Sequence, residues 1–379
     1  MIEIDSIQPI LISSDYGNNK ILGQPLGLKT IGIVKVNSKN GLFGYGESYI
    51  AIYIPELFET LVNFINNKLK NKSFENPLSI YDSFYIPFCS SNGLLASIYS
   101  GIDIALWDLT CKTYGKTLND YLDISANKDL KFYFSGGSAA FNSKEISEEI
   151  SKVNPEIFSG YKMRIGKTNW EHDLERIKTS RKGWDRCLML DAIMGTIRPP
   201  FTKKHWENKI NSLDEFLITW LEEPIHPENI YDLKNLKVMY PKIDIALGES
   251  LTGKLEIRSY LNNKYLDILQ LDVTHCGGIS MLISMLPEIQ KSNKRITMHV
   301  WGSPLAFSAN LKFASILKNV EWVEYPGVIL HAFTKFDTEY YDDSPNFQKY
   351  LIQPNFTSID FLKVRDINPY VIGTGFQMD

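Results

Sequence analysis

Charged side chains stand at the ends of several short apolar runs in this chain, and their types suit acid–base and metal chemistry. Three successive runs end in a carboxylate: Asp191, Glu222 in Glu222-Glu223-Pro224, and Glu249. Carboxylates gathered without a counter-ion repel one another, and a divalent cation resolves that repulsion. Ligation by oxygen alone favours Mg²⁺ over zinc, and Mg²⁺ keeps positions open for water and substrate. We therefore expect Asp191, Glu222 and Glu249 to bind Mg²⁺.

An acid–base pair is expected from two further runs, which end in Asp272 and His299. An aspartate beside a histidine fixes its tautomer and raises its pKa, which makes the histidine a general acid or base. Of the six histidines, only His299 ends a strongly apolar run. Glu324 ends the last run and is expected to hydrogen-bond the substrate or its carboxylate.

Two cations lie two positions apart in Lys162-Met163-Arg164. Residues two apart on a strand point to the same face, so both enter the site if one does. Two cations facing three acids suit the binding of a substrate carboxylate. A metal flanked by acid–base groups can stabilise the enediolate that forms when a proton next to a carboxylate is removed.

The elements that must position these residues are short β-like runs after about residue 130, each followed by a polar, helix-like stretch. Strands that alternate with helices indicate βα units and a parallel sheet. Eight such runs fit a closed (β/α) barrel, whose strand carboxyl ends meet at one face. The expected strands are Phe132–Ser135, Tyr161–Ile165, Cys187–Asp191, Leu217–Glu222, Ile243–Glu249, Ile268–Asp272, Ile296–His299 and Trp322–Glu324.

The N-terminal third has a different pattern and predicts an α+β domain. Runs rich in β-branched residues predict strands, and apolar residues at helical spacing predict helices. The expected strands are Ile2–Leu11, Lys29–Asn37 and Leu42–Ser48, with a polar loop over 12–28 and helices over 55–70 and 93–124. We expect three parts: this domain over 1–127, the barrel over 128–330, and a segment over 331–379 that returns to the first domain.

Composition narrows the class of protein. The 379 residues suffice for a barrel of about 250 residues and a smaller domain. A net charge of −4 gives no basic surplus for nucleic acid or an anionic membrane. The apolar stretches are shorter than the roughly 18 residues of a membrane span, and the start lacks a basic signal-peptide region. Four scattered cysteines without a C-x-x-C pair fit a reducing compartment, so we expect a cytoplasmic protein.

Taken together, these residues resemble the enolase superfamily, in its mandelate-racemase-like branch, over nearly the whole chain. The resemblance implies a modified (β/α)₇β barrel with an α+β capping domain, with Asp191, Glu222 and Glu249 as Mg²⁺ ligands. It rests on these segments: Gly44-Tyr45-Gly46-Glu47, Ser100–Leu109 with Lys112-Thr113-Tyr114-Gly115, Lys162-Met163-Arg164, the three acids, Asp272 with Cys276-Gly277-Gly278-Ile279, His299, and Glu324 in Val323-Glu324-Tyr325-Pro326.

The resemblance also implies an activity, the dehydration of a sugar acid. The C2 proton leaves, Mg²⁺ holds the enediolate, and the C3 hydroxyl departs to give a 2-keto-3-deoxy acid. His299 is expected to protonate the leaving hydroxyl and is also a candidate for the C2 base, with Asp272 orienting it. Lys162 and Arg164 would bind the carboxylate or act at C2. We expect an aldonate such as arabinonate, or another five- or six-carbon acid, and a homo-oligomer, as relatives often are.

Two positions depart from the family pattern. Many relatives carry a lysine base where this chain has Arg164, and a guanidinium stays protonated. Ile193 stands where relatives often have Asn. With one base, β-elimination is favoured. An epimerase or racemase using Lys162 opposite His299 and a non-catalytic barrel remain alternatives. A cycloisomerase is less expected, because those enzymes usually have a lysine where Asp272 stands.

Substrate specificity is expected to come from the capping domain. Its candidate segments are the loop Ser13–Gly27, which contains Tyr16, and the segment Tyr49–Pro55. Their polar side chains suit the recognition of hydroxyl groups. Two residues just beyond barrel strands, His275 and Trp301, are further candidates for lining the pocket.

Overall fold

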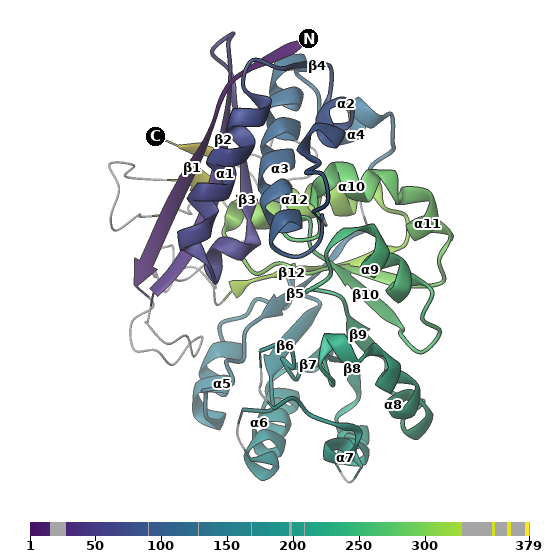
Figure 1. Ribbon diagram of the computed structural model, residues 1–379. Helices are drawn as coiled ribbons and strands as arrows, with labels where there is room; N and C mark the ends of the chain where they lie inside the picture. Colours follow the sequence, from purple (N-terminus) through teal and green to yellow (C-terminus); the bar gives the residue numbers. More distant parts are fainter. Residues whose placement is uncertain are drawn as a thin grey trace.

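The chain forms a barrel and a cap domain, which Figure 1 shows one above the other. In this computed structural model the described residues are 1–15, 28–89, 91–127, 129–167, 169–196, 199–207, 209–327, 351–352, 362–364 and 376–378.

The barrel is closed by eight parallel strands in the order β10-β11-β12-β5-β6-β7-β8-β9. Every neighbouring pair is parallel. The expected (β/α)₇β fold class with an α+β cap is therefore confirmed. The strands are β5 (Lys131–Ser135), β6 (Gly160–Arg164), β7 (Cys187–Asp191), β8 (Ile218–Glu222), β9 (Ile245–Leu247), β10 (Ile268–Leu271), β11 (Arg295–Met298) and β12 (Val320–Tyr325).

Helices occur in every connection between successive barrel strands and lie around the outside of the barrel (Figure 1). They keep the strands parallel, because a parallel pair needs a long crossover. In chain order they are α5 (Ser143–Ile150), α6 (Trp170–Gly183), α7 (Lys203–Trp206), η3 (Ile210–Phe216), η4 (Pro227–Asp232), α8 (Leu233–Met239), α9 (Gly253–Leu261), α10 (Gly278–Ser284), α11 (Leu286–Lys291) and α12 (Pro304–Ile316).

Large side chains fill the barrel interior below its mouth. Tyr133, Trp220 and Trp322 pack edge to face, with ring centroids 5.4 to 6.3 Å apart, and are joined by Met189 and Ile268. Successive side chains of a strand alternate between its faces, so the residues two positions further along also point inward. On β7, β8 and β12 those residues are Asp191, Glu222 and Glu324, which therefore lie directly above this apolar layer.

The cap domain contains an antiparallel sheet in the order β3-β2-β1-β4. Its strands are β1 (Ile2–Asp15), β2 (Leu28–Ser38), β3 (Phe43–Ser48) and β4 (Ser73–Phe74). Its helices are η1 (Tyr49–Ile52), α1 (Pro55–Leu69), α2 (Pro77–Ile80), η2 (Tyr81–Phe84), α3 (Leu94–Tyr114) and α4 (Leu118–Leu122).

Two expectations about the cap domain were wrong in detail. β1 continues to Asp15 rather than ending at Leu11, because its ladder with β2 extends to the pair Asp15 and Leu28. The single helix expected over 93–124 is divided, because Gly115 ends α3 in the left-handed conformation at φ 61° and Thr117 caps α4. Residues 16–27, including Tyr16, lie outside the described residues.

Among the described residues, α3 is the one helix long and apolar enough to cross a membrane, and most of it is buried inside the protein. It lies between β3 and α10, so it joins the cap sheet to the barrel. Its apolar composition is therefore explained by burial on several sides.

The contact between β3 and α3 depends on two glycines, and we predict that Gly46→Ala is strongly destabilising. A Cβ at Gly46 would lie 2.0 Å from the carbonyl oxygen of Gly101, and one at Gly44 2.1 Å from that of Ala105. The helix and strand must separate to make room, at a cost of about 1–3 kcal/mol or more. Urea unfolding measures the loss. As a control, Gly115→Asn should lower stability little, because Asn tolerates the left-handed conformation there; equal midpoints for Gly46→Ala and wild type would contradict the prediction.

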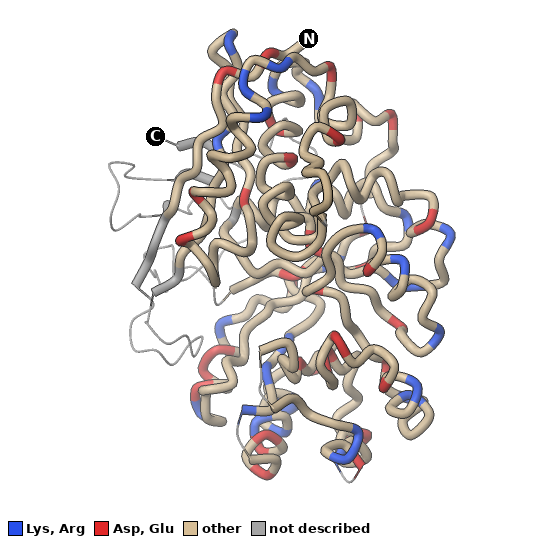
Figure 2. Tube along the Cα trace, viewed as in Figure 1, with Lys and Arg blue, Asp and Glu red and all other residues tan. Residues whose placement is uncertain are grey.

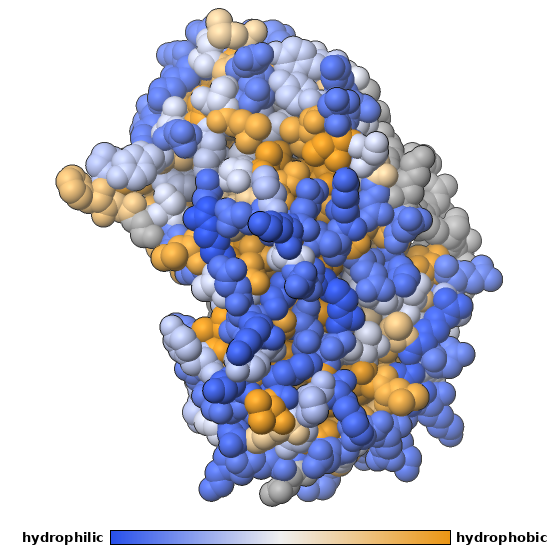
Figure 3. Space-filling model, turned by 90° about the vertical axis from the view of Figure 1, so that its right-hand side faces the viewer, coloured by the Kyte–Doolittle hydropathy of each residue, from blue (hydrophilic) through white to orange (hydrophobic). Residues whose placement is uncertain are grey.

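Figure 3 shows apolar patches separated by hydrophilic surface, and the exposed apolar residues of the cap include Leu57 and Phe64 on α1. The strands β13 (Leu351–Ile352), β14 (Leu362–Val364) and β15 (Phe376–Met378) form a small antiparallel sheet. Most of 331–379 lies outside the described residues, so its return to the cap domain stays a prediction, as do the domain borders and the homo-oligomer.

Candidate active site

Acidic residues gather at the centre of the molecule, where the barrel strands end beneath the cap domain (Figure 2). Asp191 and Glu222 are the last residues of β7 and β8. Asp272 and His299 each follow a strand by one residue, and Glu324 lies within β12. All five are buried. The barrel thus brings these expected site residues to one face.

Two carboxylates at the barrel mouth, Asp191 and Glu249, hold protons more tightly than ordinary carboxylates. Burial and the neighbouring Glu222 raise the pKa of Asp191 to about 6. Burial and Glu223 raise the pKa of Glu249 well above its usual value. Both shifts arise first from burial and second from repulsion by a neighbouring carboxylate.

Glu223 is a further carboxylate at the site and was not among the expected ligands. It is buried, and its pKa is raised to about 8 by burial and by Asp191. Gly195 N donates to its Oε2 over 2.9 Å, whereas among the described residues its Oε1 has no hydrogen-bond partner. Its φ of 41° is in the left-handed region, which is strained for a glutamate. The doubled acid before Pro224 was the only sequence signal for it.

Lys162 lies inside the carboxylate cluster. Its ammonium is 2.6 Å from Glu222 Oε1, 2.8 Å from Glu324 Oε1 and 3.8 Å from Asp191 Oδ2. Burial would lower the pKa of Lys162, but these three carboxylates outweigh burial and raise it above its ordinary value. Burial would likewise raise the pKa of Glu324, and Lys162 and His299 instead lower it to about 2. Lys162 is therefore a fixed cation at the bottom of the mouth.

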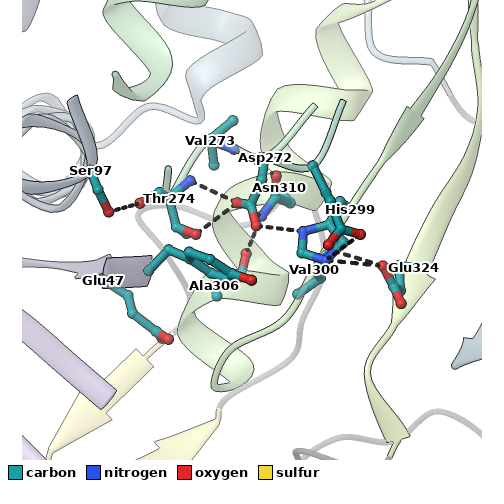
Figure 4. Close-up of polar contacts among 12 residues, drawn as sticks. Glu47, Ser97, Asp272, Val273, Thr274, His299, Val300, Ala306, Asn310 and Glu324 are labelled. Atoms are coloured by element: carbon teal, nitrogen blue, oxygen red, sulfur yellow. Dashed lines mark hydrogen bonds and ion pairs between the residues drawn. The ribbon is translucent and has the colours of Figure 1, made fainter. Parts of the chain in front are cut away.

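His299 and Asp272 are paired through His299 Nδ1 and Asp272 Oδ2, 2.9 Å apart (Figure 4). His299 Nε2 faces two other carboxylates, 3.5 Å from Glu249 Oε2 and 3.9 Å from Glu324 Oε2. Burial would lower the pKa of His299, but Glu249, Glu324 and Asp272 raise it to about 9. The imidazole is thus oriented by one nitrogen and presents the other to the barrel mouth.

Arg164 takes a different direction from Lys162, although both lie on β6. Its guanidinium donates to Gly136 O over 2.7 Å and to Ser135 Oγ over 3.0 Å. It also stacks on Trp301, 4.5 Å from the ring centroid. Arg164 and Trp301 therefore form one wall of the site, and the cation is partly satisfied by the barrel itself.

The segment after β3 contributes aromatic groups from the cap. The ring of Tyr49 lies 4.9 Å from that of His275 and 6.0 Å from that of His299, and its hydroxyl is 3.3 Å from that of Tyr53. Burial lowers the pKa of His275 to about 4, so its ring is neutral near pH 7. The segment over 49–55 thus places aromatic hydroxyls beside the acid–base pair.

The carboxylate oxygens at the barrel mouth are suitable ligands for a hard divalent cation. The pKa values of Asp191, Glu223 and Glu249 are raised although Lys162 and His299 lie nearby, which indicates too little positive charge around these carboxylates. Oxygen ligands of this kind suit Mg²⁺. Among the described residues no three side chains already meet at ligand distance from one point, so a cation would draw Asp191, Glu222 and Glu249 together.

One buried polar side chain below the mouth was also missed. Gln270 lies two residues before Asp272 on the same face of β10, and among the described residues its amide oxygen and nitrogen have no hydrogen-bond partner. A glutamine inside an otherwise apolar strand was the sequence signal for it.

Comparisons with known proteins agree with the geometry. The family model described as "Enolase C-terminal domain-like" matches residues 145–355. D-galactarolactone cycloisomerase of Agrobacterium fabrum is 31% identical over 231 residues, 59% of each chain. D-gluconate/D-galactonate dehydratase of Picrophilus torridus is 27% identical over 314 residues, 76% of each chain. A solved structure of an L-talarate/galactarate dehydratase variant, liganded with Mg and L-glucarate, has the same fold, with a TM-score of 0.78 and 21% identity over 100% of this chain and 90% of that one.

Proposed function

This chain belongs to the enolase superfamily, and from that premise we propose that it is a Mg²⁺-dependent dehydratase of a sugar acid. Its substrate is an aldonate of five or six carbons, and its product is the 2-keto-3-deoxy acid. The named relatives support the reaction class, since one that matches 76% of this chain is a D-gluconate/D-galactonate dehydratase. The Mg-liganded structure with the same fold supports the metal.

The observation that carries the proposal is that one acid–base group, His299, faces the carboxylates at the barrel mouth. His299 Nδ1 is held by Asp272, so proton exchange takes place at Nε2. Lys162 is held as a cation by Glu222 and Glu324, and Arg164 stays protonated. A racemase needs proton carriers on both faces of the substrate carbon, whereas elimination can use one.

The residues then have distinct tasks. Asp191, Glu222 and Glu249 would hold Mg²⁺, which when bound supplies positive charge that stabilises the negative charge developing on the substrate carboxylate. His299 in its neutral form takes the C2 proton at Nε2 and then gives that proton to the departing C3 hydroxyl. The C3–O bond breaks, water leaves, and the enol product rearranges to the 2-keto acid. Lys162 and Arg164 bind the carboxylate, and Trp301 restricts its access to water.

A lactone cycloisomerase is the second candidate, favoured by the 31% identity to D-galactarolactone cycloisomerase. It also moves a proton next to a carbonyl carbon, so the same His299 and carboxylate cluster would serve it. The difference lies in the leaving group, which is a ring oxygen instead of a hydroxyl. A substrate panel separates the two.

The test is a screen of the protein with Mg²⁺ against aldonic acids, aldaric acids and their lactones. We expect a 2-keto-3-deoxy product from at least one aldonate, detected by semicarbazide absorbance. Turnover of lactones alone would favour the cycloisomerase. Deuterium uptake at C2 in D₂O without any elimination would favour an epimerase and overturn the dehydratase. No turnover and no exchange across the full panel, with Mg²⁺ bound, would contradict all three.

A further inference from the structure

Asp272 is held from two sides by residues outside the expected catalytic set (Figure 4). On one side, Thr274 donates to its Oδ1 from its backbone N over 2.8 Å and from its hydroxyl over 2.7 Å. On the other, Asn310 Nδ2 donates to the same oxygen over 3.0 Å. Asp272 Oδ2 is thereby left to His299. The carboxylate cannot rotate without breaking three hydrogen bonds.

Asn310 is fully buried within α12, and both ends of its amide are used. Its Nδ2 also donates to Ala306 O over 3.1 Å, and its Oδ1 accepts from Val273 N over 3.0 Å. Val273 follows Asp272 directly, so Asn310 fixes both the side chain and the backbone at this point. A buried amide that directs two of its three hydrogen bonds at one loop is typical of a group that sets the position of another.

The cap domain in turn holds α12. Glu47, the residue before the end of β3, is buried and accepts from Ser303 N over 3.1 Å and from the Ser303 hydroxyl. Ser303 is the N-cap of α12, and its hydroxyl accepts from Leu305 N over 3.0 Å. A carboxylate at a helix N-terminus is also favoured by the helix dipole. Gly302 permits this approach, because a Cβ there would lie 2.4 Å from Glu47 Oε1.

We propose that Asn310 is a positioning residue for the Asp272–His299 pair, and that Glu47 of the cap domain sets the position of Asn310 through Ser303 and α12. Two turns of α12 separate Ser303 from Asn310. Ser303 is held by Glu47, and Asn310 is held by the Asp272 loop. The contact between the cap and the barrel at Ser303 is thereby linked to the orientation of the imidazole. The inference rests on the proposed function only in assigning His299 the proton transfer.

The test uses full-length protein with Mg²⁺ and without sugar acid. The probe is the low-field proton resonance of His299 Nδ1 at one fixed pH, identified by its loss in His299→Asn. Asn310→Asp keeps the size and the acceptor for Val273 N but replaces the donor to Asp272 by a second acidic group. We expect the resonance to move or to vanish through exchange with water. Asn310→Ser is the second variant if the first does not fold.

Glu47→Gln tests the link from the cap, and Asp103→Asn is its matched control. Asp103 is also a buried cap-domain carboxylate at the start of a barrel helix, accepting from Ser280 N of α10 over 2.8 Å. Among the described residues no side chain of α10 has a hydrogen bond to Asp272 or His299. We therefore expect Glu47→Gln to shift the His299 resonance and Asp103→Asn to leave it in place.

An unchanged His299 resonance in folded Asn310→Asp and Asn310→Ser would overturn the role of Asn310. Equal spectra for Glu47→Gln and Asp103→Asn would overturn the link to the cap. If a sugar acid is turned over, Asn310→Asp should lower kcat about 10- to 100-fold with little change in KM, the size of effect expected for a group that orients another. Because the resonance needs no substrate, failure of the dehydratase proposal would leave this result intact.

Discussion

We expect His299→Asn to lower the turnover of sugar-acid elimination by about 10²- to 10⁴-fold, the usual contribution of a positioned acid or base. The side chain of Asn retains a hydrogen-bonding group near Asp272 but cannot act as an acid or a base near neutral pH. Elimination needs a proton at C3 and the removal of one at C2, and among the described residues at the mouth His299 presents a free nitrogen for this. Mg²⁺ binding should persist, because the three expected ligands are untouched.

The measurement is kcat for the best acid of the panel, with Mg²⁺ affinity determined by calorimetry on the same protein. His172→Asn is the control, since His172 lies on α6 outside the barrel. It should behave as wild type. A His299→Asn enzyme that keeps near-wild-type turnover would show that another group moves the proton, and the assignment would be wrong.

The second large effect concerns the metal. We expect Glu222→Gln to weaken Mg²⁺ binding at least about tenfold and to reduce turnover with it, since even groups that only orient a metal ligand have effects of that size. The amide has one oxygen fewer to offer and no charge, and it also leaves Lys162 with less negative charge beside it. Calorimetry measures the Mg²⁺ affinity, and product formation at saturating Mg²⁺ measures the turnover.

Asp267→Asn is the matched control for Glu222→Gln. Asp267 also pairs with a lysine, Lys237, at 2.8 Å, but it precedes β10 and so lies at the opposite end of the barrel. Asp267→Asn should lower stability slightly through loss of that ion pair, but its Mg²⁺ affinity should equal that of wild type. Wild-type Mg²⁺ affinity in Glu222→Gln would remove Glu222 from the ligand set.

The same cluster predicts how the metal-free protein responds to pH. The folded-state pKa values of Asp191 and Glu223, about 6 and 8, lie above their usual 3.8 and 4.5. The folded state therefore binds these protons more tightly, and the stability they contribute is present at low pH and is lost as pH rises through the folded values. The unfolding temperature of metal-free protein should fall between roughly pH 5 and pH 9. Added Mg²⁺ should reduce that fall, and an equal slope with and without Mg²⁺ would argue against the site.

The strand-end acids and His299 could be predicted from the sequence because each follows a local apolar run. In a closed parallel barrel all strands end at the same face, so residues that end successive runs of the sequence lie close together in space. The location of Asp191, Glu222, Asp272 and His299 at the mouth follows from this alone. The ion pairs of Lys162 could not be predicted in this way, because they depend on the direction that each carboxylate side chain takes at the mouth.

Other residues could not be found in this way because their partners are far apart in the chain. Glu47 and Ser303 are 256 positions apart, and Asn310 is a polar residue in a largely apolar helix, which by itself predicts nothing about Asp272. The break in the helix expected over 93–124 was visible in Gly115 and Thr117, but the apolar spacing on both sides outweighed it. The extension of β1 to Asp15 depended on pairing with β2 and had no local apolar signal.

The cap domain inserts Glu47 and Asp103 into the starts of two barrel helices, and this bears on how such proteins diversify. A chimera that joined a foreign cap to this barrel near residue 127 would leave the helix starts at Ser280 and Ser303 facing a surface that never evolved to meet them. We therefore expect such a chimera to be less stable than the native chain, because the buried Glu47 and Asp103 would lose their partners at these helix starts.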